Sequence, residues 1–337
     1  MANVRIPLRA DVADVAPAGC HTLAAEIVVG ENAAYDSPVL FCFPGGGMSR
    51  RYFDLDATGY SFAEYAASHG YVVVLVDHPG VGESDVPDDG WALTPSVVAR
   101  VNAVAVGRLM ERLQTGSIEG LPAFEPTLAL GVAHSAGSLV LIHHQSAHPQ
   151  FDGLVLLGWG GHGLPEYLDA NERRLAAQPE TLTPRLVEGA KRRHDEPLVT
   201  MTPRRGSGIY IANSVSPRAH QALVDARSKL LAVVGYAAMI PRSGSTAAAA
   251  IDVPVFIGVG EKDLAVRHHE IPAEFPASRD VTLFVLDGAG HNHNVEPNRA
   301  DLWARVLGWG RAVTSRADTS VDATASRRAR LPSSSPS

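Results

Sequence analysis

The fold is decided by the stretch Leu128-Ala129-Leu130-Gly131-Val132-Ala133-His134-Ser135-Ala136-Gly137-Ser138-Leu139-Val140. An apolar run typical of a buried strand breaks at Ser135 and then continues with helical character. Small residues at 133 and 137 allow a tight strand-to-helix turn, which holds the serine in strained backbone geometry. The N–H groups at the start of the helix point to the same place. The stretch therefore predicts a nucleophilic serine at the carboxyl edge of a sheet, although small-x-Ser-x-Gly also arises by chance.

The composition is that of a globular protein. The chain has 337 residues, of which 45% are hydrophobic and 19% charged, with a formal net charge of −7. A negative charge of this size argues against nucleic acid or an anionic membrane as a partner. The two cysteines form no disulfide framework, no signal peptide opens the sequence, and the longest apolar run, 230–240, is too short to span a bilayer. We therefore expect a cytoplasmic protein.

Short apolar runs alternate with helical segments along the chain. Buried strands are predicted at 39–43, 71–77, 128–134, 151–161, 253–260 and 281–286, and 21–29 is interpreted as an edge strand. Helices are predicted at 61–68, from a cap at Thr94 to a stop at Gly116, and at 297–312. This alternation is typical of an α/β protein with a mostly parallel, doubly wound sheet.

The first buried strand stops at Pro44-Gly45-Gly46-Gly47-Met48. Consecutive glycines at a strand end indicate a close approach of backbone to another group, and a flexible turn is the alternative interpretation. In the functional interpretation, the N–H of Gly46 or Gly47 stabilises an oxyanion.

Residues 162–250 break the alternation of strand and helix. This segment is rich in proline and carries 12 Lys and Arg against 8 Asp and Glu. We interpret it as a helical cap, inserted between a core formed by 1–161 and 251–313. Residues 314–337 have almost no large apolar side chains and are predicted to be a disordered tail.

Further turns follow other predicted strands: Asp77-His78-Pro79-Gly80-Val81-Gly82-Glu83-Ser84, Gly260-Glu261-Lys262-Asp263 and Gly288-Ala289-Gly290-His291. With the glycine triplet and Ala133-His134-Ser135-Ala136-Gly137, these turns resemble, in chain order, those of the α/β-hydrolase superfamily. The resemblance covers residues 20–312 and is to the esterase- and lipase-like serine hydrolases with a helical cap. Two departures are Ala133, where glycine is commonest, and Pro44, where many members have histidine.

The resemblance implies a catalytic triad of Ser135, His291 and Asp263. The histidine takes the serine proton during attack on a carbonyl, and the aspartate orients the imidazole. The N–H of Ala136, with one from the glycine triplet, would bind the oxyanion. Asp287 and then Glu261 are the alternatives for the acid, and His293 is the alternative for the histidine.

The expected substrate is a small-molecule carboxylic ester or lactone, without cofactor or metal. Residues expected near the pocket mouth are Met48, His134, Trp159 and His162. His144 and His148 have a metal-ligand spacing but no evident third ligand, so a structural role is expected. No oligomeric state is predicted.

Three other functions stay open. A carbon–carbon bond hydrolase would use the same triad. An aminopeptidase would need acidic cap residues, for which Glu166, Asp195 and Glu196 are available, although the positive balance of the cap argues against it. A non-catalytic ligand-binding relative would not need the triad.

Overall fold

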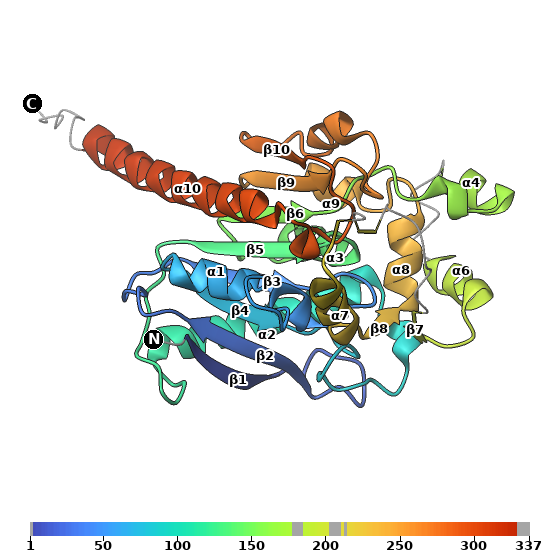
Figure 1. Ribbon diagram of the computed structural model, residues 1–337, viewed down its shortest axis with the longest axis horizontal. Helices are drawn as coiled ribbons and strands as arrows, with labels where there is room; N and C mark the ends of the chain where they lie inside the picture. Colours follow the sequence, from blue (N-terminus) through green and yellow to red (C-terminus); the bar gives the residue numbers. More distant parts are fainter. Residues whose placement is uncertain (1–2, 177–184, 202–209, 212–213, 329–337) are drawn as a thin grey trace, which may run out of the picture.

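The structure is a computed structural model that describes residues 3–176, 185–201, 210–211 and 214–328. Its centre is an eight-stranded sheet in the order β1-β2-β4-β3-β5-β6-β9-β10 (Figure 1). Neighbouring strands from β4 to β10 are parallel, whereas β2 is antiparallel to both of its neighbours. The strands are β1 (Val4–Asp11), β2 (Thr22–Val29), β3 (Val39–Phe43), β4 (Val72–Val76), β5 (Ala129–His134), β6 (Gly153–Leu157), β9 (Val255–Gly260) and β10 (Val281–Leu286). The predicted α/β class with a mostly parallel sheet is confirmed.

The strand predicted at 21–29 is confirmed as β2, but the prediction that it lies at the edge of the sheet is wrong. β1 pairs along the outer side of β2 over its whole length, from Val4 opposite Val29 to Asp11 opposite Thr22. In β1 the residues Ile6, Leu8 and Ala10 turn toward the core while their neighbours are exposed. Pro7 is one of the exposed residues of this alternation. A proline weakens the sequence signal for a strand, but it is tolerated in an edge strand.

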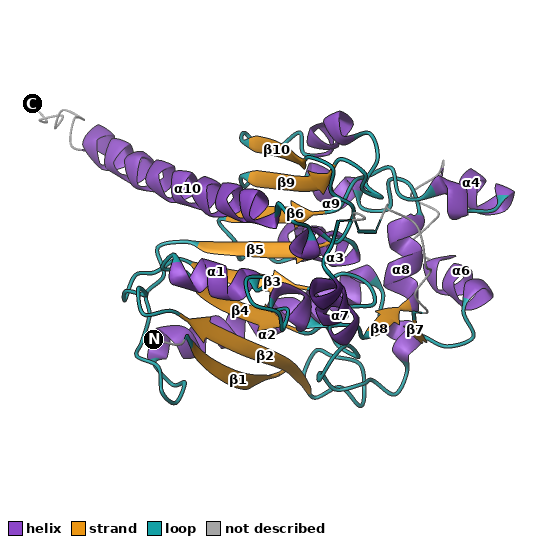
Figure 2. Ribbon diagram, in the orientation of Figure 1, coloured by secondary structure: helices purple, strands orange, loops and turns teal. Residues whose placement is uncertain are grey.

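Helices cover both faces of the sheet (Figure 2). α1 (Phe62–Ser68) and α10 (Arg299–Arg328) pack on one face, and α2 (Pro95–Thr115) and α3 (Ala136–Ala147) on the other. Successive strand residues point to opposite faces, so Phe41 joins one core and its neighbours Leu40 and Cys42 join the other. Burial on both faces explains why the central strands are continuous apolar runs.

The boundaries of α2 follow from its sequence, and the prediction is confirmed. The side chain of Thr94 accepts a hydrogen bond from the N–H of Val97, Pro95 occupies the first turn, and Gly116 ends the helix at φ 66°. A proline at the start and a left-handed glycine at the end are the usual signals.

The cap segment combines helices with a small sheet. α4 (Ala170–Ala176), α6 (Leu186–Arg193), α7 (Pro217–Asp225), α8 (Ala232–Met239) and α9 (Ser245–Ala249) are joined by the antiparallel pair β7 (Leu198–Thr200) and β8 (Lys229–Leu231). α4, α6 and α8 gather beyond the sheet, on the right in Figure 1. The segment predicted to be a helical cap therefore also contains two strands. Each strand has three residues and is too short to show a period in the sequence.

The last helix is longer than predicted. α10 continues beyond residue 312 to Arg328, so the backbone of 314–328 differs from the predicted disordered tail, and 329–337 lie outside the described residues. Extending an existing helix through alanine-containing sequence needs no new nucleus. None of the helices in the described part of the chain has the length and apolar character that crossing a bilayer requires.

Candidate active site

Ser135 occupies the turn between β5 and α3 with φ 54° and ψ −125°. A positive φ is uncommon for a residue with a side chain and is held here by the surrounding structure. The N–H of Ser135 donates to the carbonyl of Leu157 on β6 at 2.7 Å. A Cβ atom on Gly137 would lie 2.2 Å from the carbonyl oxygen of Pro44, so the first turn of α3 requires glycine there. The strained serine turn predicted from the sequence is present.

Three residues from separate turns form one line of hydrogen bonds. Oγ of Ser135 lies 2.8 Å from Nε2 of His291, and Nδ1 of His291 lies 2.6 Å from Oδ1 of Asp263. The residues His291 and Asp263 are each 6% exposed. The turns after β5, β9 and β10 thus bring together the serine, acid and histidine that were chosen from the sequence.

The Asp263 carboxylate is held ionised and in a fixed orientation. The backbone N–H groups of Gly260 and Ala265 each donate to it at 3.1 Å. Burial raises the pKa of this carboxyl, but the charges and hydrogen bonds of His291 and His293 outweigh burial and hold its pKa well below the usual range. An ionised Asp263 favours the tautomer of His291 with its proton on Nδ1.

The acid and histidine turns touch at Gly260. A Cβ atom there would lie 2.3 Å from the carbonyl oxygen of Gly290 and 2.5 Å from that of Ala289. Glycine at the end of β9 therefore permits the approach that places Asp263 beside His291. From the sequence, Gly260 was identified as part of the acid turn, but its contact with the histidine turn was not predicted.

His293, the alternative histidine, binds the same acid. Its Nε2 lies 2.8 Å from Oδ2 of Asp263, and its side chain is fully buried. Only His291 reaches Ser135. The two alternative acids lie elsewhere: Asp287 is exposed, and the exposed Glu261 accepts a hydrogen bond from the N–H of Gly288 at 2.8 Å.

Each glycine of the loop Pro44–Met48 has its own close neighbour. A Cβ atom on Gly45 would lie 2.7 Å from Nδ1 of His134, and one on Gly46 would lie 2.6 Å from Leu230 of the cap. Gly47 has φ +78°, and a Cβ atom there would lie 3.0 Å from Met201. The triplet is therefore packed against the serine turn and the cap rather than forming a free turn.

A small pocket, open to solvent, lies beside the serine turn. Gly46 and Ala136 border it from the core, and Leu230, Leu231 and Val234 border it from the cap. His78 also reaches it from the end of β4. This lining gives the pocket an apolar character.

The four residues expected near the pocket mouth have the following partners. Nε2 of His134 lies 2.8 Å from the carbonyl oxygen of His291, so this buried imidazole contacts the backbone of the histidine turn. Trp159 is buried against Phe275. His162 pairs with Glu270, and Met48 forms a β-bridge to Arg227. None of the four lines the pocket just described. The sequence places these residues near the serine, but the direction of each side chain depends on its tertiary partner.

Other residues singled out in the sequence also lie apart. The acidic cap residues are exposed and do not border the pocket: Glu166, Asp195 and Glu196. His144 is buried and its Nε2 lies 2.7 Å from Oε1 of Gln150, whereas His148 is exposed. His144 therefore has a partner within the protein fold.

Comparisons with known proteins agree with this geometry. The family model "Alpha/beta hydrolase family" matches residues 39–305. Among solved structures, a lipase in an open form is 18% identical with a TM-score of 0.61, covering 92% of this chain and 99% of its own. An esterase from Thermogutta terrifontis is 13% identical with a TM-score of 0.58 over the same shares of the two chains.

A third similar structure is the enol-lactonase from Burkholderia xenovorans LB400. It is 18% identical with a TM-score of 0.55, covering 86% of this chain and 96% of its own. At such identities the similarity concerns the fold. None of the curated proteins compared with the chain matches its sequence significantly. The family match spans most of the chain and includes the serine, acid and histidine turns, so this protein belongs to the alpha/beta hydrolase family.

Proposed function

We propose that this hydrolase cleaves a carboxylic ester or a lactone through an acyl-enzyme formed on Ser135. The observation that carries the proposal is the continuous line of hydrogen bonds from Ser135 through His291 to Asp263. A serine hydroxyl is a weak nucleophile at neutral pH and needs a base within hydrogen-bonding distance. The 2.8 Å contact with His291 supplies that base.

In the first step, Ser135 attacks the substrate carbonyl while His291 accepts its proton. His291 then returns the proton to the leaving alcohol, or to the ring oxygen of a lactone, and the acyl group remains on Ser135. In the second step, water attacks the acyl carbon while His291 accepts its proton, and His291 then returns that proton to Oγ of Ser135 as the acid is released. Asp263 stabilises the imidazolium at both stages, because its charge lies 2.6 Å from Nδ1.

The N–H groups of Ala136 and Gly46 are the better pair for the oxyanion. Both residues border the pocket beside Ser135, and their Cβ positions would be 3.6 Å apart. Gly47 is the weaker choice, because it does not border that pocket. Each well-placed donor contributes about 3 kcal/mol to stabilisation of the transition state.

The test uses p-nitrophenyl esters and a fluorophosphonate probe on wild type, Ser135→Ala and Ser138→Ala. The control serine lies one turn along α3, is buried, and donates to the carbonyl of Ala133. Wild type and Ser138→Ala are expected to turn over the esters and to gain one probe mass, whereas Ser135→Ala does neither. Unchanged ester turnover by Ser135→Ala contradicts the proposal.

A panel of substrates separates the related activities. The panel holds simple esters, lactones, a vinylogous diketone and an aminoacyl p-nitroanilide. Hydrolysis of the diketone well above that of every ester would replace the proposal with carbon–carbon bond hydrolysis. The three acidic residues considered for the free amine of a peptide substrate, Glu166, Asp195 and Glu196, are exposed and offer no buried site for it.

A further inference from the structure

Two consecutive residues after β4 contact the chain on either side of the three glycines: His78 contacts Pro44 at the start of the loop, and Asp77 contacts Arg50, two residues beyond its end. Asp77 and His78 are both buried, and the mechanism above uses neither of them. The two side chains have different partners: Asp77 binds the backbone N–H of Arg50, and His78 binds the carbonyl of Pro44. We propose that Asp77 and His78 are positioning residues that hold this loop in the geometry needed to bind the oxyanion, an inference that rests on the proposed function.

His78 holds the beginning of the loop. Its Nε2 lies 3.1 Å from the carbonyl oxygen of Pro44, and its Nδ1 lies 2.8 Å from Nδ2 of Asn102 on α2. A carbonyl oxygen only accepts hydrogen bonds, so Nε2 carries the proton and Nδ1 accepts from the amide of Asn102. The tautomer of His78 is thereby fixed, with its N–H directed at the loop.

Burial also keeps the charge of His78 constant. Desolvation lowers the pKa of this imidazole to about 4, so it is neutral at physiological pH. Its ring stacks on Phe43, the last residue of β3, with ring centroids 5.9 Å apart. The imidazole is thus held on three sides, by Asn102, Phe43 and the Pro44 carbonyl.

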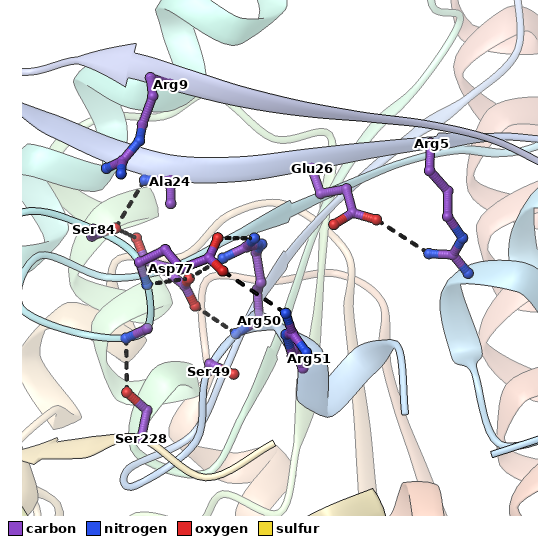
Figure 3. Close-up of polar contacts among 12 residues, drawn as sticks. Arg5, Arg9, Ala24, Glu26, Ser49, Arg50, Arg51, Asp77, Ser84 and Ser228 are labelled. Atoms are coloured by element: carbon purple, nitrogen blue, oxygen red, sulfur yellow. Dashed lines mark hydrogen bonds and ion pairs between the residues drawn. The ribbon is translucent and has the colours of Figure 1, made fainter. Parts of the chain in front are cut away.

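Asp77 holds the end of the loop. Its Oδ1 accepts a hydrogen bond from the backbone N–H of Arg50 at 2.6 Å, and its Oδ2 pairs with the guanidinium of the same residue. The N–H of Glu83 also donates to Asp77, at 3.1 Å. Figure 3 shows this carboxylate between the two residues that follow the glycine loop, Ser49 and Arg50, and the turn after β4. Side-chain exposures of 0% for Asp77 and 6% for Arg50 make this a buried ion pair.

The cap closes the remaining side of the loop. The N–H of Ser49 donates to the carbonyl of Ala226, and the N–H of Ser228 donates to that of Gly47, each at 2.9 Å. Oγ of Ser228 accepts from the N–H of Gly82 at 2.7 Å, which ties the cap to the turn after β4 (Figure 3). The first two contacts fix Gly47 and Ser49 against the cap, while Gly46 borders the pocket.

The discriminating pair of variants is His78→Leu and His144→Leu. Both histidines are buried beside Phe43, and burial lowers the pKa of each to about 4. Only His78 contacts the glycine loop, whereas His144 binds Gln150. His78→Gln is the conservative variant, because its terminal amide can donate to the Pro44 carbonyl.

We expect His78→Leu to lower kcat for a p-nitrophenyl ester by about ten- to a hundredfold with KM within about twofold, as for a misplaced oxyanion donor. Affinity for an alkylboronic acid, whose adduct on Ser135 places an oxygen at the oxyanion position, should fall by the same factor. His78→Gln should recover most of both losses, and His144→Leu should keep both values near wild type.

Hydrogen exchange of the loop amides gives a readout that does not depend on activity. Faster exchange of residues 45–50 is expected in His78→Leu and in Asp77→Asn, but not in His144→Leu. If wild type hydrolyses no ester, the proposed function fails and the exchange comparison still decides whether these residues hold the loop. Should His78→Leu fail to fold, Asn102→Leu replaces it. Without the Asn102 amide, the proton of His78 is no longer held on Nε2, the nitrogen that faces the Pro44 carbonyl.

Two results would overturn the inference. The first is equal kinetics and equal loop exchange in His78→Leu and His144→Leu. The second is a rise in KM with kcat unchanged in His78→Leu, which would make His78 a substrate contact in the pocket rather than a positioning residue.

Discussion

Nε2 of His293 lies 2.8 Å from Oδ2 of Asp263, on the carboxylate oxygen opposite to the one that faces His291. One carboxylate therefore binds two imidazoles, of which only one reaches the serine. Because His293 is fully buried, water does not replace its hydrogen bond when the side chain is removed. The second imidazole orients the acid for the first.

This relationship predicts unequal effects of substitution at the two histidines. His293→Phe should lower kcat about tenfold with little change in KM, because Asp263 loses one of its orienting donors. His293→Gln, which keeps a donor, should recover most of that loss. His291→Gln should lose about a thousandfold or more, because the general base is gone. Steady-state kinetics on a p-nitrophenyl ester measure all three, and equal losses at the two positions would contradict this assignment.

Stability should fall on mild acidification because of the buried neutral histidines. Burial lowers the pKa of His78 and of His144 to about 4 from a usual value of 6.5. Between these values the unfolded chain binds more protons than the folded one, so the free energy of unfolding rises with pH. Each histidine contributes a slope of up to about 1.4 kcal/mol per pH unit in this window.

Urea unfolding of wild type and His144→Leu at pH 7.5, 6.0 and 5.0 measures that slope. The variant should show a shallower dependence on pH, by about 1 kcal/mol per unit. Parallel curves for the two proteins would mean that His144 is already protonated in the fold or does not titrate in this range.

Gly137 and Gly308 should respond oppositely to alanine. A methyl group at Gly137 meets the Pro44 carbonyl, so Gly137→Ala should destabilise the protein by about 1–3 kcal/mol and displace the glycine loop, with a large loss of kcat. Gly308 lies in α10 with nothing within 4 Å of the added carbon, so Gly308→Ala should stabilise by about 0.5–1 kcal/mol. Chemical denaturation and ester kinetics test both. A neutral Gly137→Ala variant would show that the first turn of α3 can move.

Val234 should limit the size of the apolar group that the pocket accepts. Its side chain borders the pocket from α8 and is 4% exposed. If the pocket binds the acyl group, Val234→Phe should reduce kcat/KM for a p-nitrophenyl hexanoate by more than tenfold while changing the acetate about twofold, because added volume excludes the longer chain. Val86→Phe, at a position that is 56% exposed, is the control and should change neither. An equal fall for both esters would place the acyl group elsewhere.

The sequence alone was sufficient for the elements whose signal is local. An apolar run followed by small residues around Ser135 predicted the strained strand-to-helix turn, and Thr94 with Gly116 predicted the limits of α2. Both features depend on backbone conformation within a few residues, so they can be read without knowledge of distant partners. The acid and histidine turns were instead identified by their resemblance, in chain order, to those of the α/β-hydrolase superfamily.

The prediction was weaker where partners are far apart in sequence. β1 was missed because Pro7 weakens its strand signal, and the strands of the cap are too short to show a period. His134 was expected near the pocket mouth, but its side chain contacts the carbonyl oxygen of His291. The direction of this side chain therefore depends on a residue 157 positions away in the sequence.

What the sequence by itself determined is the order of chemistry-bearing turns along the chain and the strained conformation of Ser135. Only the tertiary structure decided which side chains share a partner: His293 with His291 on Asp263, and Asp77 with His78 on the glycine loop. The physical reason is that a hydrogen bond needs donor and acceptor within about 3 Å, and for these pairs that distance arises only when separate strands lie side by side in the sheet.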